Sequence, residues 1–264
     1  MSWLHAIQSG SASVLVIAAA LAVVSVLETA LPLVPRNRWN RIHLTPNLVL
    51  GSITLVTNLV LSAALVVLLG GLAARKVGLF PTLGLTGPAE LAAGLLGLDF
   101  SFYLAHVAMH KFPSLWRFHT VHHADPAVDA TTTLRQHPGE TLIRFAYTTV
   151  FACTLGVSPA AYLVYRSAVA LNGLLEHGNL HLPRRVDDLL ALVTTWSAFH
   201  KVHHSRNPAQ TDTNYGNLFS WWDRFFGTAT PARVGERVTY GLEGLDDERT
   251  QSFAGLMILP FRRS

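Results

Sequence analysis

Long apolar stretches with very few charged residues constrain this chain more than any other feature of its sequence. Residues 11–33, 48–72 and 88–110 are each long enough to cross a bilayer, which takes about 20 mainly apolar residues in a helix. Only 14% of all residues are charged and the mean hydropathy is +0.33, whereas soluble domains carry about 25% charged residues. The sequence therefore predicts an all-α integral membrane protein with about three transmembrane helices.

The first of these segments has an alternative interpretation as a cleaved signal peptide. A signal peptide carries its basic residues ahead of the apolar core. Here Arg36, Arg38 and Arg41 follow the segment, and no lysine or arginine precedes it. A retained helix is therefore the favoured interpretation of residues 11–33.

A fourth apolar segment, residues 142–175, is interrupted by the sequence Gly-Val-Ser-Pro at 156–159. At 1.5 Å per residue each half reaches only about 22 Å, which is short of a hydrocarbon core of roughly 30 Å. The pattern predicts a helical hairpin that enters and leaves the membrane on one side, or two short tilted spans. From residue 183 onwards the chain is more polar.

Basic residues indicate which side of the membrane the loops occupy. Three arginines lie in the connection at 35–47, and Arg75 and Lys76 lie in the next one. The positive-inside rule then places residues 35–47 in the cytoplasm. Three crossings and one hairpin put every histidine-rich segment on that same side. Because the basic residues form no continuous stripe, nucleic acid is not expected as a partner.

Thirteen histidines against one cysteine, Cys153, are the unusual part of the composition. A lone cysteine excludes a disulfide framework within the chain and a thiolate-rich zinc or iron–sulfur site. Eight of the histidines form three short motifs, one H-x-x-x-H and two copies of H-x-x-H-H. Their positions are His106, His110, His119, His122, His123, His200, His203 and His204.

Histidines three or four residues apart share a helix face and can reach one metal ion together. Neutral imidazole suits iron, copper, nickel and zinc, and eight ligands exceed the four of a structural zinc site, so two metal ions are expected. Asp99, two turns before His106, is expected to accept a ring N–H and orient that ligand. Incidental helix pairs and a pH sensor are the alternatives for a single motif. Haem is disfavoured because the motifs lie at helix ends.

The three motifs, in this order, occur together with the run D-T-N-Y-G-N-L-F-S-W-W-D-R-F-F-G-T at 212–228. This combination resembles the fatty acid hydroxylase and sterol desaturase superfamily of membrane diiron oxidoreductases, over residues 28–227. The resemblance implies that the eight motif histidines are metal ligands and that His177 is a further one. His181 stays open as a ligand, and Val107 departs from the arginine that relatives often carry there.

His137 also stays open, as a ligand, a residue behind the ligands, part of a substrate pocket, or a loop residue hydrogen-bonded to Glu140. His5 and His43 lie outside the motifs and are expected at the membrane interface. Asp223 and Arg224 are expected to form a surface ion pair, and residues 214–216 a turn.

The resemblance implies one membrane-embedded domain over residues 1–264. We expect transmembrane helices within 11–110 and a membrane hairpin at 142–175. The expected cytoplasmic cap over the dimetal site comprises 111–141 and 176–230, with a C-terminal tail at 231–264.

By the same resemblance, two iron ions and O2 would hydroxylate or desaturate a C–H bond of a sterol, fatty acyl or related lipid. Electrons are expected from an external ferredoxin or b-type cytochrome with its reductase, because the chain shows no cofactor segment of its own. The oligomeric state stays open. The alternatives are a zinc hydrolase, which needs fewer ligands, and a membrane metal-binding or zinc transport protein. A transporter would place ionisable residues inside its spans, whereas Glu28, Glu90 and Asp99 lie near segment ends.

Overall fold

The computed structural model describes residues 3–232 and 238–262, with side chains from residue 14 onwards. Within this part the chain is helical, and its only β-type pairing is three isolated bridges, Pro32 with Leu180, Thr194 with Phe219 and Ser205 with Tyr240. The all-α prediction is therefore confirmed for the described residues. His5, expected at the interface, lies outside the described side chains.

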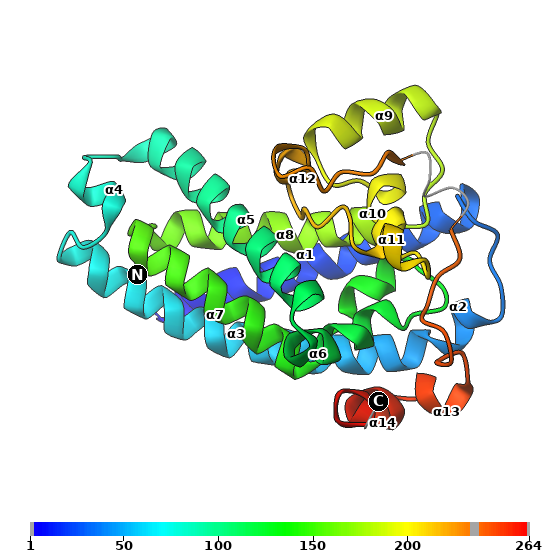
Figure 1. Ribbon diagram of the computed structural model, residues 1–264. Helices are drawn as coiled ribbons and strands as arrows, with labels where there is room; N and C mark the ends of the chain where they lie inside the picture. The colour runs from blue at the N-terminus through cyan, green and yellow to red at the C-terminus, as the bar shows by residue number, and fades with distance from the viewer. Residues whose placement is uncertain (1–2, 233–237, 263–264) are drawn as a thin grey trace.

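Five long helices form a bundle that runs across Figure 1 from left to right. Helix α5 packs against α7 and α8, helix α3 packs against α7 and α8, and α1 packs against α8. Their bounds are α1 Trp3–Ala30, α3 Leu44–Ala74, α5 Gly87–Lys111, α7 Pro138–Leu155 and α8 Pro159–His177.

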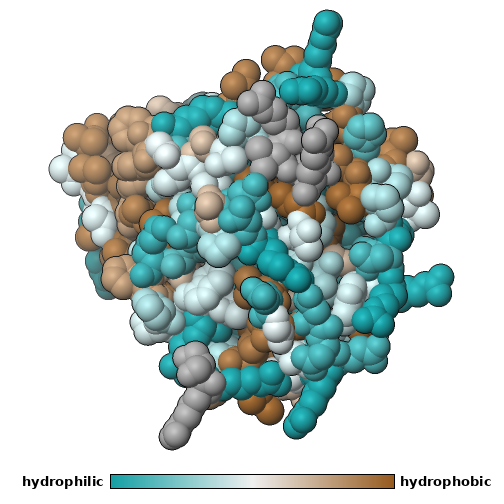
Figure 2. Space-filling model, turned by 45° about the vertical axis from the view of Figure 1, so that its right-hand side comes forward, coloured by the Kyte–Doolittle hydropathy of each residue, from teal (hydrophilic) through white to brown (hydrophobic). Residues whose placement is uncertain are grey.

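Two segments of the described chain are long and apolar enough to cross a membrane, Trp39–Thr82 and Gly87–Lys111. Helix α1 adds a shorter apolar stretch, Val14–Ala30. On α3, Val56, Val60 and Val67 are 62–76% exposed, although all three are strongly apolar. Figure 2 shows hydrophobic residues gathered at the left of that view, whereas hydrophilic residues cover most of the face turned to the viewer. Contiguous apolar surface of this kind fits contact with lipid.

The segment predicted as a hairpin forms α7 and α8, joined at Gly156. This glycine has a φ of +71° and packs against Gly78, so the turn lies where α3 has just ended, far from the histidines. Glu90 accepts hydrogen bonds from the backbone N–H and the hydroxyl of Ser158, which holds the turn against α5. With 18 and 19 residues, the two helices are about 27 and 29 Å long, longer than the predicted 22 Å. The difference arises because Pro138 begins α7 ahead of the apolar stretch and α8 continues to His177.

Short helices form a cap at one end of the bundle, on the right of Figure 1. Helix α4, Leu79–Thr82, lies at the opposite end. The cap contains α2 Trp39–Ile42, α6 Pro113–His123, η1 Ala130–Leu134, α9 Arg184–Val193, α10 Ser197–His203, α11 Pro208–Thr211, α12 Trp221–Phe225, α13 Glu248–Gln251, α14 Phe253–Ile258 and η3 Leu259–Phe261.

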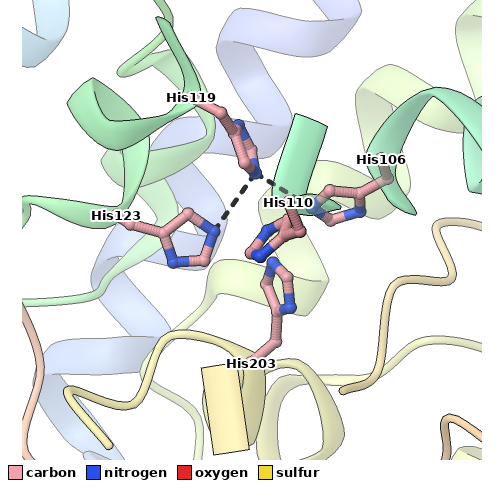
Figure 3. Close-up of side chains that lie close together, drawn as sticks. All are labelled: His106, His110, His119, His123 and His203. Atoms are coloured by element: carbon pink, nitrogen blue, oxygen red, sulfur yellow. Dashed lines mark hydrogen bonds between the residues drawn. The ribbon is translucent and has the colours of Figure 1, made fainter. Parts of the chain in front are cut away.

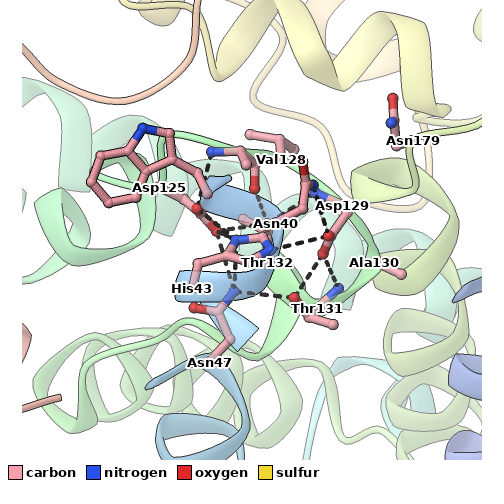
Figure 4. Close-up of polar contacts among 12 residues, drawn as sticks. Asn40, His43, Asn47, Asp125, Val128, Asp129, Ala130, Thr131, Thr132 and Asn179 are labelled. Atoms are coloured by element: carbon pink, nitrogen blue, oxygen red, sulfur yellow. Dashed lines mark hydrogen bonds and ion pairs between the residues drawn. The ribbon is translucent and has the colours of Figure 1, made fainter. Parts of the chain in front are cut away.

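His43 was expected at the membrane interface, and this prediction is wrong. The ring is fully buried, with Nδ1 2.8 Å from Asp125 and Nε2 3.0 Å from Asp129 (Figure 4). Asn47, one turn along α3, donates to Asp125 and to Thr131. Both carboxylates lie more than 80 residues further along the chain, so no local pattern around His43 indicated them. Together these contacts fix the start of α3 to the loop after α6.

Arg135 extends this network to the C-terminal helices. Its side chain is fully buried and donates to the carbonyl of Val121, to Asn47 and to Gln251. Gln251 in turn donates to the carbonyl of Ala124. One guanidinium thus connects α3, α6 and α13.

We expect Arg135→Met to lower the free energy of unfolding by about 3–5 kcal/mol, because it leaves the buried oxygens of Val121, Asn47 and Gln251 without their donor and removes a positive charge near Asp125. Arg184→Met is the matched control, because Arg184 is exposed and its ion pair to the exposed Asp188 is long at 3.9 Å. The control is expected to stay within about 0.5 kcal/mol of the wild type. Thermal unfolding in detergent measures both, and equal losses would contradict the role given to Arg135.

Candidate metal centre

Nine histidines converge beneath the cap in two adjacent groups, within each of which the facing ring nitrogens all lie within 4.8 Å of one another. Figure 3 shows the first group, with its rings turned toward a common centre. Helices α5, α6, α8 and α10 supply the rings. The first group is His106, His110, His119, His123 and His203, and the second is His122, His177, His200 and His204.

Helical spacing divides each H-x-x-H-H motif between the two groups. In α6, His119 and His123 are four residues apart and face the first group, while His122 faces the second. In α10 the assignment is reversed, because His200 and His204 face the second group and His203 the first. Each motif therefore contributes to both groups, which brings the two groups side by side.

Backbone carbonyls orient four of these rings. A carbonyl oxygen only accepts hydrogen bonds, so the Nδ1 atom that faces it carries the ring proton and Nε2 keeps its lone pair. In metal sites, backbone carbonyls of this kind commonly fix the tautomer and the direction of an imidazole ligand. The pairs are His106 with Tyr215 at 2.8 Å, His122 with Arg135 at 3.2 Å, His177 with Gly173 at 2.8 Å and His203 with Thr213 at 2.8 Å.

The Nε2 atoms that face one another are better placed to bind a metal ion than to form hydrogen bonds with each other. His122 and His177 both use Nδ1–H on a carbonyl, yet their Nε2 atoms lie 3.0 Å apart with a lone pair on each. Two acceptors at this distance repel unless a cation lies between them. In the first group, Nε2 of His110 and His203 are buried without a hydrogen-bond partner among the described residues. The donor set is thus suited to imidazole-binding metal ions.

Burial also keeps these imidazoles in the form that binds metal. Burial first, and neighbouring imidazoles second, hold the pKa of His119, His123 and His200 well below the ordinary value. The pKa of His204 is lowered for the same reasons. The rings are therefore neutral at physiological pH.

Glu140 was expected only as a hydrogen-bond partner of His137, and it has a different role. Its Oε1 lies 3.1 Å from Nδ1 of His119 and forms an ion pair with Arg144 at 2.6 Å. A carboxylate at this position favours the ring proton on Nδ1 and turns Nε2 of His119 to the first group. The spacing of Glu140 and Arg144, four residues apart at the start of α7, is the only local signal that marked this pair.

Two of the open histidines lie outside both groups. His137 caps α7, where its Nδ1 accepts from the N–H of Gly139, and its ring packs against Phe118 and Phe261. His181 is exposed. His177, by contrast, lies in the second group.

The prediction that Asp99 orients a ligand ring is wrong. Both its oxygens accept hydrogen bonds from the segment 218–222, namely from the N–H groups of Leu218 and Phe219 and from the indole of Trp222. Asp99 lies seven residues before His106, which places its carboxylate two helical turns from that ring and beside residues 218–222.

Asp223 is buried rather than part of a surface ion pair. It accepts from the N–H groups of Tyr215 and Gly216 and from the hydroxyl of Thr228. The turn predicted at 214–216 is not formed, because these residues are irregular, with Asn214 at a φ of +56°. Asp223 thus holds in place the segment whose Tyr215 carbonyl orients His106.

The fold and the site together define an α-helical protein with a two-group histidine centre at one end of an apolar bundle. The model of the fatty acid hydroxylase family matches residues 91–228, which is 138 of the 264 residues and includes all nine histidines. The chain belongs to the fatty acid hydroxylase family, as its motifs indicated.

Relatives of known name are similar over about half of this chain. Alkylglycerol monooxygenase of Caenorhabditis elegans is 34% identical over 148 residues, covering 54% of this chain and 28% of that protein. Ornithine lipid hydroxylase of Rhizobium tropici is 32% identical, covering 53% and 41%. A cholesterol 25-hydroxylase-like protein of Danio rerio is 32% identical, covering 53% and 55%. The matched part thus spans between about a quarter and about half of these relatives. No solved structure matches the chain.

Two metal ions per chain are expected after anaerobic purification with iron, one for each histidine group. His119→Ala removes a ligand from the first group and His200→Ala one from the second, so each is expected to lower the content toward one ion. His181→Ala is the control, because His181 is exposed and outside both groups. Elemental analysis at matched expression measures all four proteins. A wild type that holds a single ion would contradict the two-group assignment.

Proposed function

We propose that this protein is a membrane-bound, O2-dependent lipid hydroxylase with two iron ions held by the nine histidines. The observation that carries the proposal is a cavity of about 300 Å³ that runs from the histidines into the bundle between α3, α7 and α8. His106, His122, His177 and His200 line its inner end. A hydrocarbon chain in this cavity would thus lie beside both groups.

When bound, the iron pair supplies the activation of O2. The overall reaction would be R–H plus O2, two electrons and two protons, giving R–OH and H2O. Hydroxylation is favoured over desaturation because the relatives reported above are named as monooxygenases or hydroxylases.

The residues of the chain bind the substrate and keep water away. Phe102, Phe145, Val169 and Leu174 line the cavity near the histidines and offer apolar contacts to a methylene chain. Exclusion of water protects reactive species from side reactions. A mainly apolar cavity that reaches the histidines is therefore suited to attack on an unactivated C–H bond.

The cavity opens toward the outer surface of the bundle. Leu55, Leu59 and Leu163 all line it and are 40–48% exposed. In the proposed membrane orientation, with the cap in the cytoplasm and α3 in contact with lipid, a substrate would enter sideways from the bilayer. The cap then lies within reach of an external electron donor, a ferredoxin or a b-type cytochrome with its reductase. Cys153, the only cysteine, cannot hold an iron–sulfur cluster by itself.

Lipid extracts from cells that express the wild type are expected to contain species heavier by one oxygen, with label taken up from 18O2. His203→Ala is expected to abolish these species, because His203 belongs to the first group. His181→Ala is expected to retain them. Mass spectrometry of matched cultures makes the comparison, and a product that has lost two hydrogens instead would replace hydroxylation by desaturation.

Cysteine labelling in sealed vesicles tests the proposed orientation, after replacement of Cys153. Ser114→Cys and Asn207→Cys lie in exposed parts of the cap and are expected to share one accessibility. Lys76→Cys, exposed at the other end of α3, is expected to show the opposite one. Opposite accessibility for Ser114 and Asn207 would contradict an even number of crossings between them.

A further inference from the structure

The charged side chains that line the cavity differ in whether they have a hydrogen-bond or ion-pair partner. Arg144, Arg166 and Glu176 are the charged side chains that line it besides the histidines. Arg144 is paired with Glu140, and Glu176 accepts from Asn172 and lies 3.6 Å from His177. Arg166 makes no hydrogen bond or ion pair with any described residue. Of the two arginines that line the cavity, Arg166 is therefore the one without a partner among the described residues.

Arg166 is also far from the histidines. It lies eleven residues before His177 in the continuous helix α8, which is about 16 Å along the helix axis. An arginine in the middle of a membrane helix is costly, and such residues usually face a cavity and mark a substrate site. Here Arg166 is one of the residues that line the cavity reaching the histidines.

Further polar groups surround the same part of the cavity. Asn58 of α3 lines it and has no hydrogen-bond partner among the described side chains. Ser62 and Tyr162 line it as well and bond to each other at 2.9 Å, and Ser167 is next to Arg166. Between this polar region and the histidines the wall is mainly apolar, with Leu55, Val169 and Ala170.

We propose that Arg166 and Asn58 bind the anionic head group of a single-chain lipid, a carboxylate or a phosphate, whose hydrocarbon tail extends toward the histidines. Arginine suits such anions because its planar donors pair with two oxygens at once. The cavity volume of about 300 Å³ is at the lower end for ligand sites and favours one chain over two. The substrate would therefore be oxidised far from its head group.

This assignment rests on the proposed function, but its binding test does not require turnover. Two hexadecanoic acid probes are used, one with a photoreactive diazirine next to the carboxylate and one with it near the methyl end. The first is expected to label α3 around Asn58 and α8 around Arg166. The second is expected to label residues near Phe102 and Leu134, which line the inner end. The reverse pattern would overturn the proposal.

Arg166→Met is expected to reduce labelling by the carboxylate-end probe about tenfold, since one charge-assisted hydrogen-bonding group is lost. Arg166→Lys keeps the charge and is expected to keep most of the labelling. The methyl ester of the same probe is expected to label all variants equally. Arg184→Met, an exposed arginine of the cap, is the control for changes in expression and unfolding temperature. Equal labelling of wild type and Arg166→Met by the acid would overturn the head-group site.

Turnover distinguishes the proposed head-group site from the proposed hydroxylase activity. If the acid binds with the expected polarity and the iron-loaded protein adds no oxygen to any lipid, the binding site stands and the proposed hydroxylase activity fails. If oxygen is added next to the head group, the activity stands and the head-group site at Arg166 is overturned.

Discussion

Nine imidazoles buried against one another are the constraint on which the rest of this structure depends. Neutral rings whose acceptor atoms lie about 3 Å apart repel, as His122 and His177 do across 3.0 Å. Buried polar atoms without a partner cost free energy that the surrounding fold must offset. Cations between the rings would turn this repulsion into attraction. Metal binding at these rings would therefore be coupled to the packing of α6 and α10 against α5 and α8.

The ring orientations depend mainly on the backbone rather than on side chains. Carbonyls of Tyr215, Thr213 and Arg135 come from loops, and each loop is fixed by a buried polar residue elsewhere. Asp223 binds the N–H of Tyr215, and Arg135 is held between Asn47 and Gln251. A substitution well outside the histidine motifs can therefore change metal affinity by moving one of these carbonyls.

The features that local spacing determines were predictable from sequence. The apolar segments indicated the bundle helices, and the three motifs indicated the histidine centre. The division of each H-x-x-H-H motif between two groups follows from helical geometry. It could not be predicted without knowing where α8 places His177, which belongs to the second group. The partners of His43 and Asp99 could not be predicted, because they lie more than 80 residues away in sequence. Glu140 was noticed only for its neighbour His137, since nothing local links it to His119.

The bond network around Gln251 has a consequence for the order of events during synthesis. Gln251 donates to the carbonyl of Ala124 and accepts from Arg135. The segment after the second histidine motif therefore lacks these two hydrogen bonds until residue 251 has left the ribosome. At about 5–20 residues per second, the more than 110 residues between them represent at least several seconds of translation. During that interval the end of α6, with His122 and His123, is held only by its other contacts. The second histidine motif therefore reaches its final surroundings only late in synthesis.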